Sequence, residues 1–254
     1  MSFSGARLIM VLLLCATISG CGKREPDGPR LLLLCAAGMR EPVSGVVREF
    51  EDQTGIEVDI QFGGSGTLLA MMDQVKADLY LAADVAYLEE ASERGLVISR
   101  HEIGTQSPVL AWNTSRKFGV SNLPEWVMGS RRQGMVIPEA GAIGKVTEEV
   151  LKQKRVWNDM KPHARFVTVY ELANAIQLGA VDSGIVWDNV AAGYEGITIQ
   201  KLASLDKVVS KVEVAVLLSS PLPEVATRFA RFLAAEETGR VFFRAHGLKM
   251  EEAP

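Results

Sequence analysis

The sequence predicts an α/β fold in which buried parallel strands alternate with helices. Residues 31–37, LLLLCAA, form a continuous apolar run, as expected of a strand buried on both faces. Residues 41–55 follow with apolar side chains at helical spacing, an acid near the start and Gly55 as a stop. The same alternation continues along the chain, which is the pattern of a parallel, right-handed α/β sheet.

Two further strand–helix units complete the first part of the chain. Each unit pairs a short apolar run with a segment whose apolar residues recur at helical spacing. Asp84 can cap the second of the two helices and Gly95 can end it. The predicted strands are at 56–62 and 77–83, and the predicted helices at 67–75 and 84–95.

The middle of the chain repeats the pattern, and a final strand leads into two helices. No low-complexity linker or internal repeat separates these parts. The predicted strands are at 107–113, 134–138, 165–169, 183–187 and 212–218, and the predicted helices at 123–129, 143–157, 170–179, 222–235 and 238–245.

The N-terminus has the features of a secretory signal at residues 1–20. One cation, Arg7, precedes an apolar stretch that is too short to span a bilayer. The residues ISGC that end at Cys21 resemble a bacterial lipobox, so we expect Cys21 to be acylated and residues 21–30 to tether the protein to a membrane. The alternative is an ordinary secretory signal with an incidental cysteine.

Composition narrows the function classes. The formal net charge is −4 with acids and bases interspersed, so nucleic acid is not an expected partner. Cys35 lies in an apolar run and is expected to be a buried, inert thiol. The three histidines are scattered without metal-ligand spacing, so we expect no metal site and no cofactor. About 230 residues follow the signal, enough for one large domain or two lobes.

Small residues gather where predicted strands end and helices begin. In open parallel sheets, ligands lie at this edge. Glycine lets a backbone approach closely, and a helix start presents N–H groups that have partial positive charge and no intrahelical acceptor. Several such starts aimed at one point would bind a small oxyanion without Lys or Arg. The junctions are AAGMRE at 36–41, FGGSGT at 62–67, PEAGAIGK at 138–145, TVYE at 168–171 and VWDN at 186–189.

The order and spacing of these segments resemble the type II periplasmic solute-binding proteins of ABC importers, closest to the molybdate-binding branch. AAGMREP, FGGSGTL and ADLYLAAD are followed by AWN, IPEAGAIGKVTEEVL, GIVW and FLAAEETGRVFFRAHGL, so the resemblance covers residues 31–249. It implies two lobes, each a mostly parallel sheet flanked by helices, joined by a two-stranded hinge. Lobe 1 would be 31–107 plus 211–254, and lobe 2 would be 108–210.

The resemblance also implies the ligand contacts. They fall on Gly38, Ser65, Ile143, Val169 and Trp187. The family typically has serine at the first of these positions and often tyrosine at the last, so two side-chain donors are missing. Backbone N–H groups remain expected donors, and these belong to Met39, Ser65, Gly66 and Gly144.

The expected protein is a monomeric receptor in the periplasm or at the cell surface. It would bind molybdate or tungstate, present its closed form to the membrane subunits of the importer, and catalyse no reaction. We expect the protein to bind a metal only as the central atom of the oxyanion ligand. Sulfate, phosphate and small carboxylates remain alternative ligands, and presentation to a signalling sensor remains an alternative to transport.

Other readings of the same motifs are weaker. The glycine-rich segments lack the spacing of dinucleotide and phosphate loops, and no nucleophile motif supports a secreted enzyme. Asp188 is expected at the rim of the cleft, outside direct contact, because a carboxylate would repel a dianion. Arg40 and Lys145 either lie on solvated helix faces or steer an anion toward the cleft.

Overall fold

The computed structural model describes residues 28–116, 119–129 and 132–250. The predicted signal peptide and Cys21 lie outside these ranges, as does most of the predicted tether. Within the described ranges, every helix is too short or too polar to traverse a bilayer.

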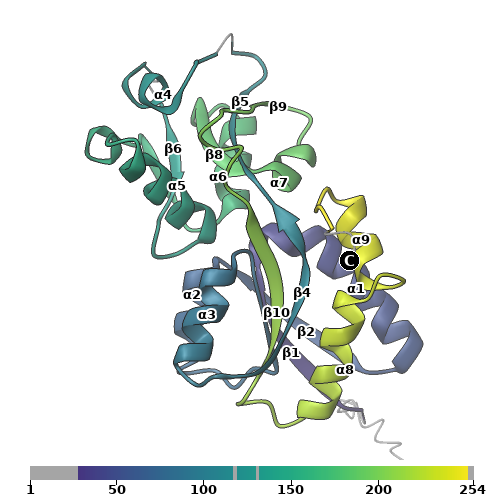
Figure 1. Cartoon of the computed structure of the whole chain (residues 1–254). Helices are drawn as coiled ribbons and strands as arrows, with labels where there is room; N and C mark the ends of the chain where they lie inside the picture. The colour runs from purple at the N-terminus through teal and green to yellow at the C-terminus, as the bar shows by residue number, and fades with distance from the viewer. Residues whose placement is uncertain (1–27, 117–118, 130–131, 251–254) are drawn as a thin grey trace, which may run out of the picture.

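The chain folds into two halves, which we call lobe 1 and lobe 2 (Figure 1). Lobe 1 is built on a five-stranded sheet in the order β2-β1-β3-β10-β4. Strand β1 pairs in parallel with β2 and β3, whereas β10 runs antiparallel to β3 and β4. The strands are β1 (Arg30–Ala36), β2 (Glu57–Gly63), β3 (Leu79–Ala82), β4 (Val97–Gln106) and β10 (Ser210–Leu217).

The sheet of lobe 1 is therefore mixed, and the expectation of a mostly parallel sheet was wrong in this detail. The reason is topological: β10 re-enters lobe 1 from lobe 2 and so runs against its neighbours. Strand β4 was not predicted, because its middle is rich in polar side chains at the sheet edge. Two cross-strand ion pairs neutralise these charges, Arg100–Glu213 at 2.7 Å and Lys211–Glu102 at 2.8 Å.

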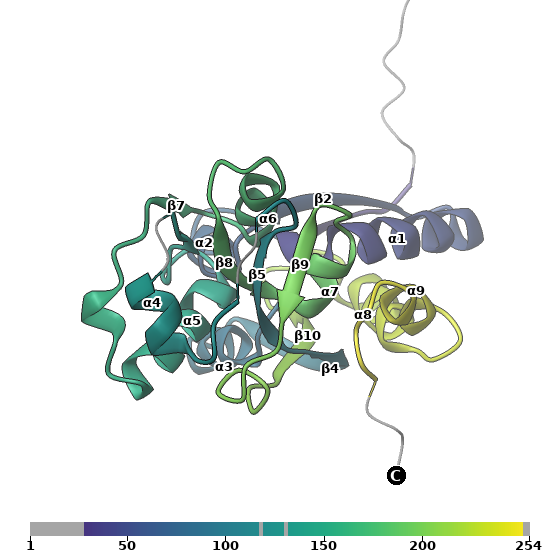
Figure 2. The ribbon, with the colours of Figure 1, turned by 90° about the horizontal axis from the view of Figure 1, so that it is seen from above.

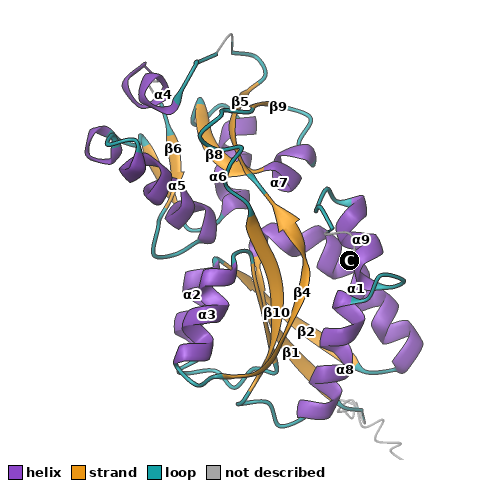
Figure 3. Cartoon of the chain, viewed as in Figure 1, coloured by secondary structure: helices purple, strands orange, loops and turns teal. Residues whose placement is uncertain are grey.

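Helices cover both faces of this sheet (Figure 3). Leu31, Leu33 and Cys35 of β1 pack into one apolar cluster, and Leu34 and Ala36 into another, because successive side chains of a strand point to opposite faces. The first cluster lies under α1 (Arg40–Thr54), α8 (Pro223–Ala234) and α9 (Gly239–Ala245), and the second under α2 (Ser65–Met71) and α3 (Val85–Glu93).

Cys35 is fully buried, as the sequence predicted. Burial raises the pKa of its thiol, so the group stays protonated and unreactive at neutral pH.

Lobe 2 contains a three-stranded antiparallel sheet, β8-β5-β9, and a parallel pair, β6-β7. An isolated parallel bridge from Gln133 to Ser183 links the two. Figure 2 shows α4 and α5 at the end of the molecule opposite α1 and α9. The elements are β5 (Pro108–Asn113), α4 (Leu123–Gly129), β6 (Gly134–Val136), α5 (Ala142–Gln153), β7 (Ala164–Phe166), α6 (Val169–Gln177), β8 (Ser183–Trp187), α7 (Asp188–Ala192) and β9 (Ile197–Gln200).

Three details of lobe 2 differ from the sequence prediction. Its three-stranded sheet is antiparallel rather than mostly parallel, because β5 runs antiparallel to both β8 and β9. The four-residue edge strand β9 was not predicted. Val169 was placed at the end of a strand, but it is the first residue of α6, because the Thr168 side chain caps that helix in a capping box with Glu171.

The chain passes between the lobes twice. Strand β4 ends at Gln106 just before β5 begins at Pro108, and the return occurs between β9 and the start of β10 at Ser210. Ser210 pairs with Gln106, so the two crossing segments run side by side at this point. The predicted lobe boundaries at 107/108 and 210/211 remain proposals.

Replacing Phe50 with alanine is expected to lower the free energy of unfolding by about 3–5 kcal/mol. The Phe50 ring is fully buried, and its centroid lies 4.6 Å from that of Phe229 and 5.3 Å from that of Phe232. Denaturant unfolding of the variant would measure the change. Leu178→Ala is the control, because that side chain is 82% exposed. An equal loss in both variants would contradict this account of the core.

Candidate functional site

A small space lies between the lobes, where the strand-to-helix junctions of both meet. Its volume is about 20 Å³. Because one water molecule needs about 10–15 Å³, this space is narrow in the closed form. Its walls are Ala36, Ala37, Gly38, Gly63, Gly64, Ser65 and Ala83 of lobe 1 and Gly141, Ala142, Ile143, Thr168, Val169 and Trp187 of lobe 2.

No residue in these walls has an ionisable side chain, and two have hydroxyl groups. Ser65 Oγ accepts a hydrogen bond from the Ala83 N–H at 3.2 Å, and Thr168 Oγ1 accepts one from the Glu171 N–H at 3.2 Å. A hydroxyl that accepts such a bond still has its proton to donate. Both side chains are thus arranged as donors toward a guest that accepts hydrogen bonds.

Helix starts supply the remaining polarity. Helices α2, α5 and α6 begin at the cavity, with the N-cap residues Gly64, Gly141 and Thr168, and α7 begins just after Trp187. The first N–H groups of a helix lack intrahelical acceptors and carry partial positive charge. The starts of α2, α5 and α6 together give the cavity partial positive charge without a formal charge, which favours an anion. The first N–H groups of α7 do not contribute, because the Asp188 N–H donates to the Ser107 carbonyl oxygen and the Asn189 N–H to the Asp188 carboxylate.

The lobes contact each other directly beside the cavity. The Thr67 N–H donates to the Ala140 carbonyl oxygen at 3.2 Å, and the Tyr87 hydroxyl donates to the Pro138 carbonyl oxygen at 3.4 Å. A Cβ at Gly66 would lie 2.0 Å from the Glu139 carbonyl oxygen, closer than any real contact. The structure is therefore a closed form that depends on bare backbone at this glycine.

The structure brings five of the residues named from the sequence around the cavity: Gly38, Ser65, Ile143, Val169 and Trp187. A Cβ on Gly38 would lie 3.4 Å from Val169 Cγ1 and 3.6 Å from Trp187 Cδ1. These are ordinary van der Waals distances, so a Cβ at position 38 would fit between the Val169 and Trp187 side chains.

Three other predicted residues do not line the cavity. Met39 is fully buried in the core beside α1, and Gly66 packs against the Glu139 carbonyl across the interface. Gly144 packs against the carbonyl groups of Val136 and Ile137. Thr168 lines the cavity but was missed as a contact, although the T-x-x-E pattern of a capping box at 168–171 signals its position.

The charged residues considered from the sequence also lie outside the cavity walls. The Asp188 carboxylate accepts hydrogen bonds from the Ser107 N–H at 2.9 Å, the Asn189 N–H at 3.0 Å and Lys249 Nζ at 3.1 Å. The Arg40 guanidinium lies 4.1 Å from the centre of the Phe62 ring, and Lys145 Nζ lies 5.2 Å from that of Tyr87. Within the described part of the chain, no group of three or more His, Cys, Asp or Glu side chains could hold a metal ion.

The two-lobed α/β fold, with a small cavity where the lobes meet, is typical of solute-binding proteins. Comparison with protein families agrees: residues 31–249 match the model of the family described as bacterial extracellular solute-binding protein. The chain belongs to this family, so it is an extracellular solute-binding protein and not an enzyme.

Individual relatives are more distant. A putative binding protein of Haemophilus influenzae is 28% identical over 217 residues, 84% of this chain and 88% of that protein. The molybdate-binding protein ModA of Escherichia coli is 20% identical over 189 residues, 70% of this chain and 73% of that protein. The periplasmic molybdate-binding protein of Azotobacter vinelandii superposes with a TM-score of 0.71 at 18% identity, over 87% of this chain and 100% of that structure. This likeness confirms the type II fold.

Gly66→Ala is expected to hinder closure and to weaken solute binding at least tenfold, because the added methyl group would meet the Glu139 carbonyl oxygen across the interface. Small-angle scattering, with and without an oxyanion, would show whether the variant stays extended. Gly129→Ala is the control, since a Cβ there meets nothing within 4 Å. Normal compaction of the Gly66 variant would contradict this reading of the interface.

Proposed function

We propose that the protein captures a small tetrahedral dianion, molybdate or tungstate, between its lobes and delivers it to the importer's membrane subunits. The observation that carries the proposal is the cavity itself. Two hydroxyl groups and three helix starts lie at one small space, and no charged side chain lines it. Preorganised dipoles of this kind replace the hydration shell of an anion.

The proton content of the ligand is a second argument. Molybdate, tungstate and sulfate only accept hydrogen bonds at neutral pH, whereas phosphate keeps a proton that needs an acceptor. Two acids directly follow wall residues in the sequence, Asp84 and Asp188, and neither lines the cavity. Both carboxylates already accept hydrogen bonds elsewhere. We therefore expect phosphate to bind less tightly than the fully deprotonated ions.

The residues proposed to contact the ligand are Gly38, Ser65, Ile143, Val169 and Trp187, with Thr168 added from the structure. We keep the backbone N–H groups of Met39, Gly66 and Gly144 in the proposal as weaker candidates, since none of the three residues lines the cavity. Similarity to ModA favours molybdate among dianions of equal charge and shape.

We further propose that the mature protein is held at a membrane surface by lipid on Cys21, with residues 21–30 as the tether. An extracellular location agrees with the family. A lipid anchor would keep the receptor close to its importer and raise the local concentration of closed receptor there.

The proposal is tested by thermal unfolding with molybdate, tungstate, sulfate, phosphate and acetate. A ligand that binds only the native state raises the melting temperature by mass action. Molybdate and tungstate are expected to give the largest increases. A larger increase with phosphate or acetate would refute the proposed ligand class.

Ser65→Ala is expected to weaken molybdate binding by about 1 kcal/mol or more, because it removes a hydroxyl donor from the cavity wall. Isothermal titration calorimetry would measure the dissociation constant. Ser44→Ala is the control, as the Ser44 hydroxyl donates to the Arg40 carbonyl oxygen on the exposed side of α1. An unchanged dissociation constant for the Ser65 variant would mean that the ligand binds elsewhere.

A further inference from the structure

We propose that a second pocket between the lobes binds a small organic cation with N–H groups, such as a primary alkylammonium ion. The pocket has a volume of about 490 Å³ and is lined by residues of both lobes. This size lies within the usual range for small-molecule sites, about 300–1,000 Å³. Gly38 lines both this pocket and the oxyanion cavity, so the two spaces share a wall.

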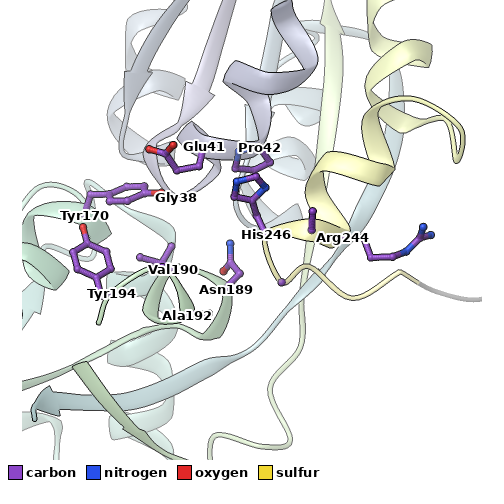
Figure 4. A pocket seen from close by; sticks show the side chains of 13 residues that line it. Gly38, Glu41, Pro42, Tyr170, Asn189, Val190, Ala192, Tyr194, Arg244 and His246 are labelled. Carbon is purple, nitrogen blue, oxygen red and sulfur yellow. The ribbon is translucent and has the colours of Figure 1, made fainter. Parts of the chain in front are cut away.

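The first argument is the charge that faces the pocket. Glu41, in the first turn of α1, presents a carboxylate there and forms no ion pair with any described residue. Arg244 also lines the pocket, but its Nη2 lies 2.7 Å from Glu236 Oε2 and its side chain extends away from the space in Figure 4. The Arg40 guanidinium also acts on the Tyr170 ring, but it lies over the Phe62 ring and does not line the pocket. Among the lining residues, the carboxylate without an ion-pair partner is that of Glu41.

The second argument is an aromatic wall. Tyr170 and Tyr194 lie next to each other on the lobe 2 side, below Glu41 in Figure 4, with ring centres 6.2 Å apart. Burial, and after it the Glu41 carboxylate, raises the pKa of Tyr170 to about 12, so its phenol is neutral at physiological pH. The faces of neutral aromatic rings attract cations.

The third argument is a buried amide that lacks a partner. Asn189 is 8% exposed, and its side chain projects toward His246 at the pocket (Figure 4). Its Oδ1 accepts no hydrogen bond from the described residues. In Figure 4 the amide nitrogen is the end nearer His246; a half turn would present the oxygen there and move the nitrogen to the buried position. In that orientation an N–H group of the ligand can donate to the oxygen.

Neighbouring groups are also acceptors. His246 Nδ1 lies 2.8 Å from the Phe242 carbonyl oxygen and so carries the proton, which leaves Nε2 as an acceptor in the neutral ring. Ala192 and Gly193 at the end of α7, and Ala245 at the end of α9, line the pocket as well. Helix ends favour cations, whereas the helix starts at the oxyanion cavity favour anions.

Both this pocket and the oxyanion cavity form when the two lobes close, because each is lined by residues of both lobes. Glu41 belongs to lobe 1, and Tyr170, Asn189 and Tyr194 belong to lobe 2. A cation that contacts both sides favours the closed form, which also holds the oxyanion. The two ligands should therefore strengthen each other's binding, and by linkage the effect is mutual.

Isothermal titration calorimetry of the mature protein with ethylammonium and 1,4-diaminobutane tests the proposal. Both are expected to bind, and Glu41→Gln is expected to weaken them at least fivefold. Asn189→Ala should also weaken them. Glu49→Gln, on the exposed surface of the same helix, is the matched control and should change nothing. Tetramethylammonium, which lacks N–H groups, and neutral glycerol should bind less tightly.

Absence of ammonium binding, or binding that Glu41→Gln leaves unchanged, would overturn the proposal. Equal binding of tetramethylammonium or glycerol would overturn the ligand class. The titrations are repeated with molybdate present, where tighter ammonium binding is expected and unchanged binding would overturn the coupling. If molybdate itself fails to bind, the proposed function fails, while the ammonium titration without molybdate still tests this pocket independently.

Discussion

The close approach of two backbones across the lobe interface is the constraint on which the rest of the structure depends. The first turn of α2 meets the 138–140 turn of lobe 2 with no side chain between them at Gly64 and Gly66. A Cβ at Gly64 would lie 2.2 Å from the Ala140 carbonyl oxygen, so only glycine permits this contact. Because the lobes meet so closely, the junctions behind the contact leave only a small space between them, with a volume of about 20 Å³.

The cavity and its surroundings differ in electrostatic character. Helices α2, α5 and α6 start at the cavity, where their first N–H groups lack intrahelical acceptors, while several acids and bases of the chain form ion pairs at other surfaces. A low-dielectric enclosure strengthens each dipole contact. A neutral wall also avoids the cost of burying a cationic side chain when the cavity is empty. Binding without formal charge is thus consistent with a receptor that must also release its cargo.

Much of the fold could be predicted because its signals are local. The apolar run at 31–37 and the glycine-rich turn after β2 identify buried strands and tight junctions without knowledge of distant contacts. Strands β4 and β9 could not be predicted, since both are stabilised by pairing at the edge of a sheet. Strand β4 is also stabilised by an ion pair with β10. The cavity wall was predicted in part. Ser65 follows from its turn, whereas the burial of the Met39 side chain in the core depends on how the last residue of a 3₁₀ turn is oriented.

The position of Trp187 between the lobes allows opening and closing to be followed by fluorescence. Its indole is 1% exposed in the closed form and lies against Gly38 of the opposite lobe, whereas Trp126 is buried within lobe 2 and donates to Ser183 Oγ at 2.9 Å. When the lobes separate, water reaches the first ring and not the second. The intrinsic emission of the protein should then shift to longer wavelength, which gives an optical signal of opening that needs no attached dye.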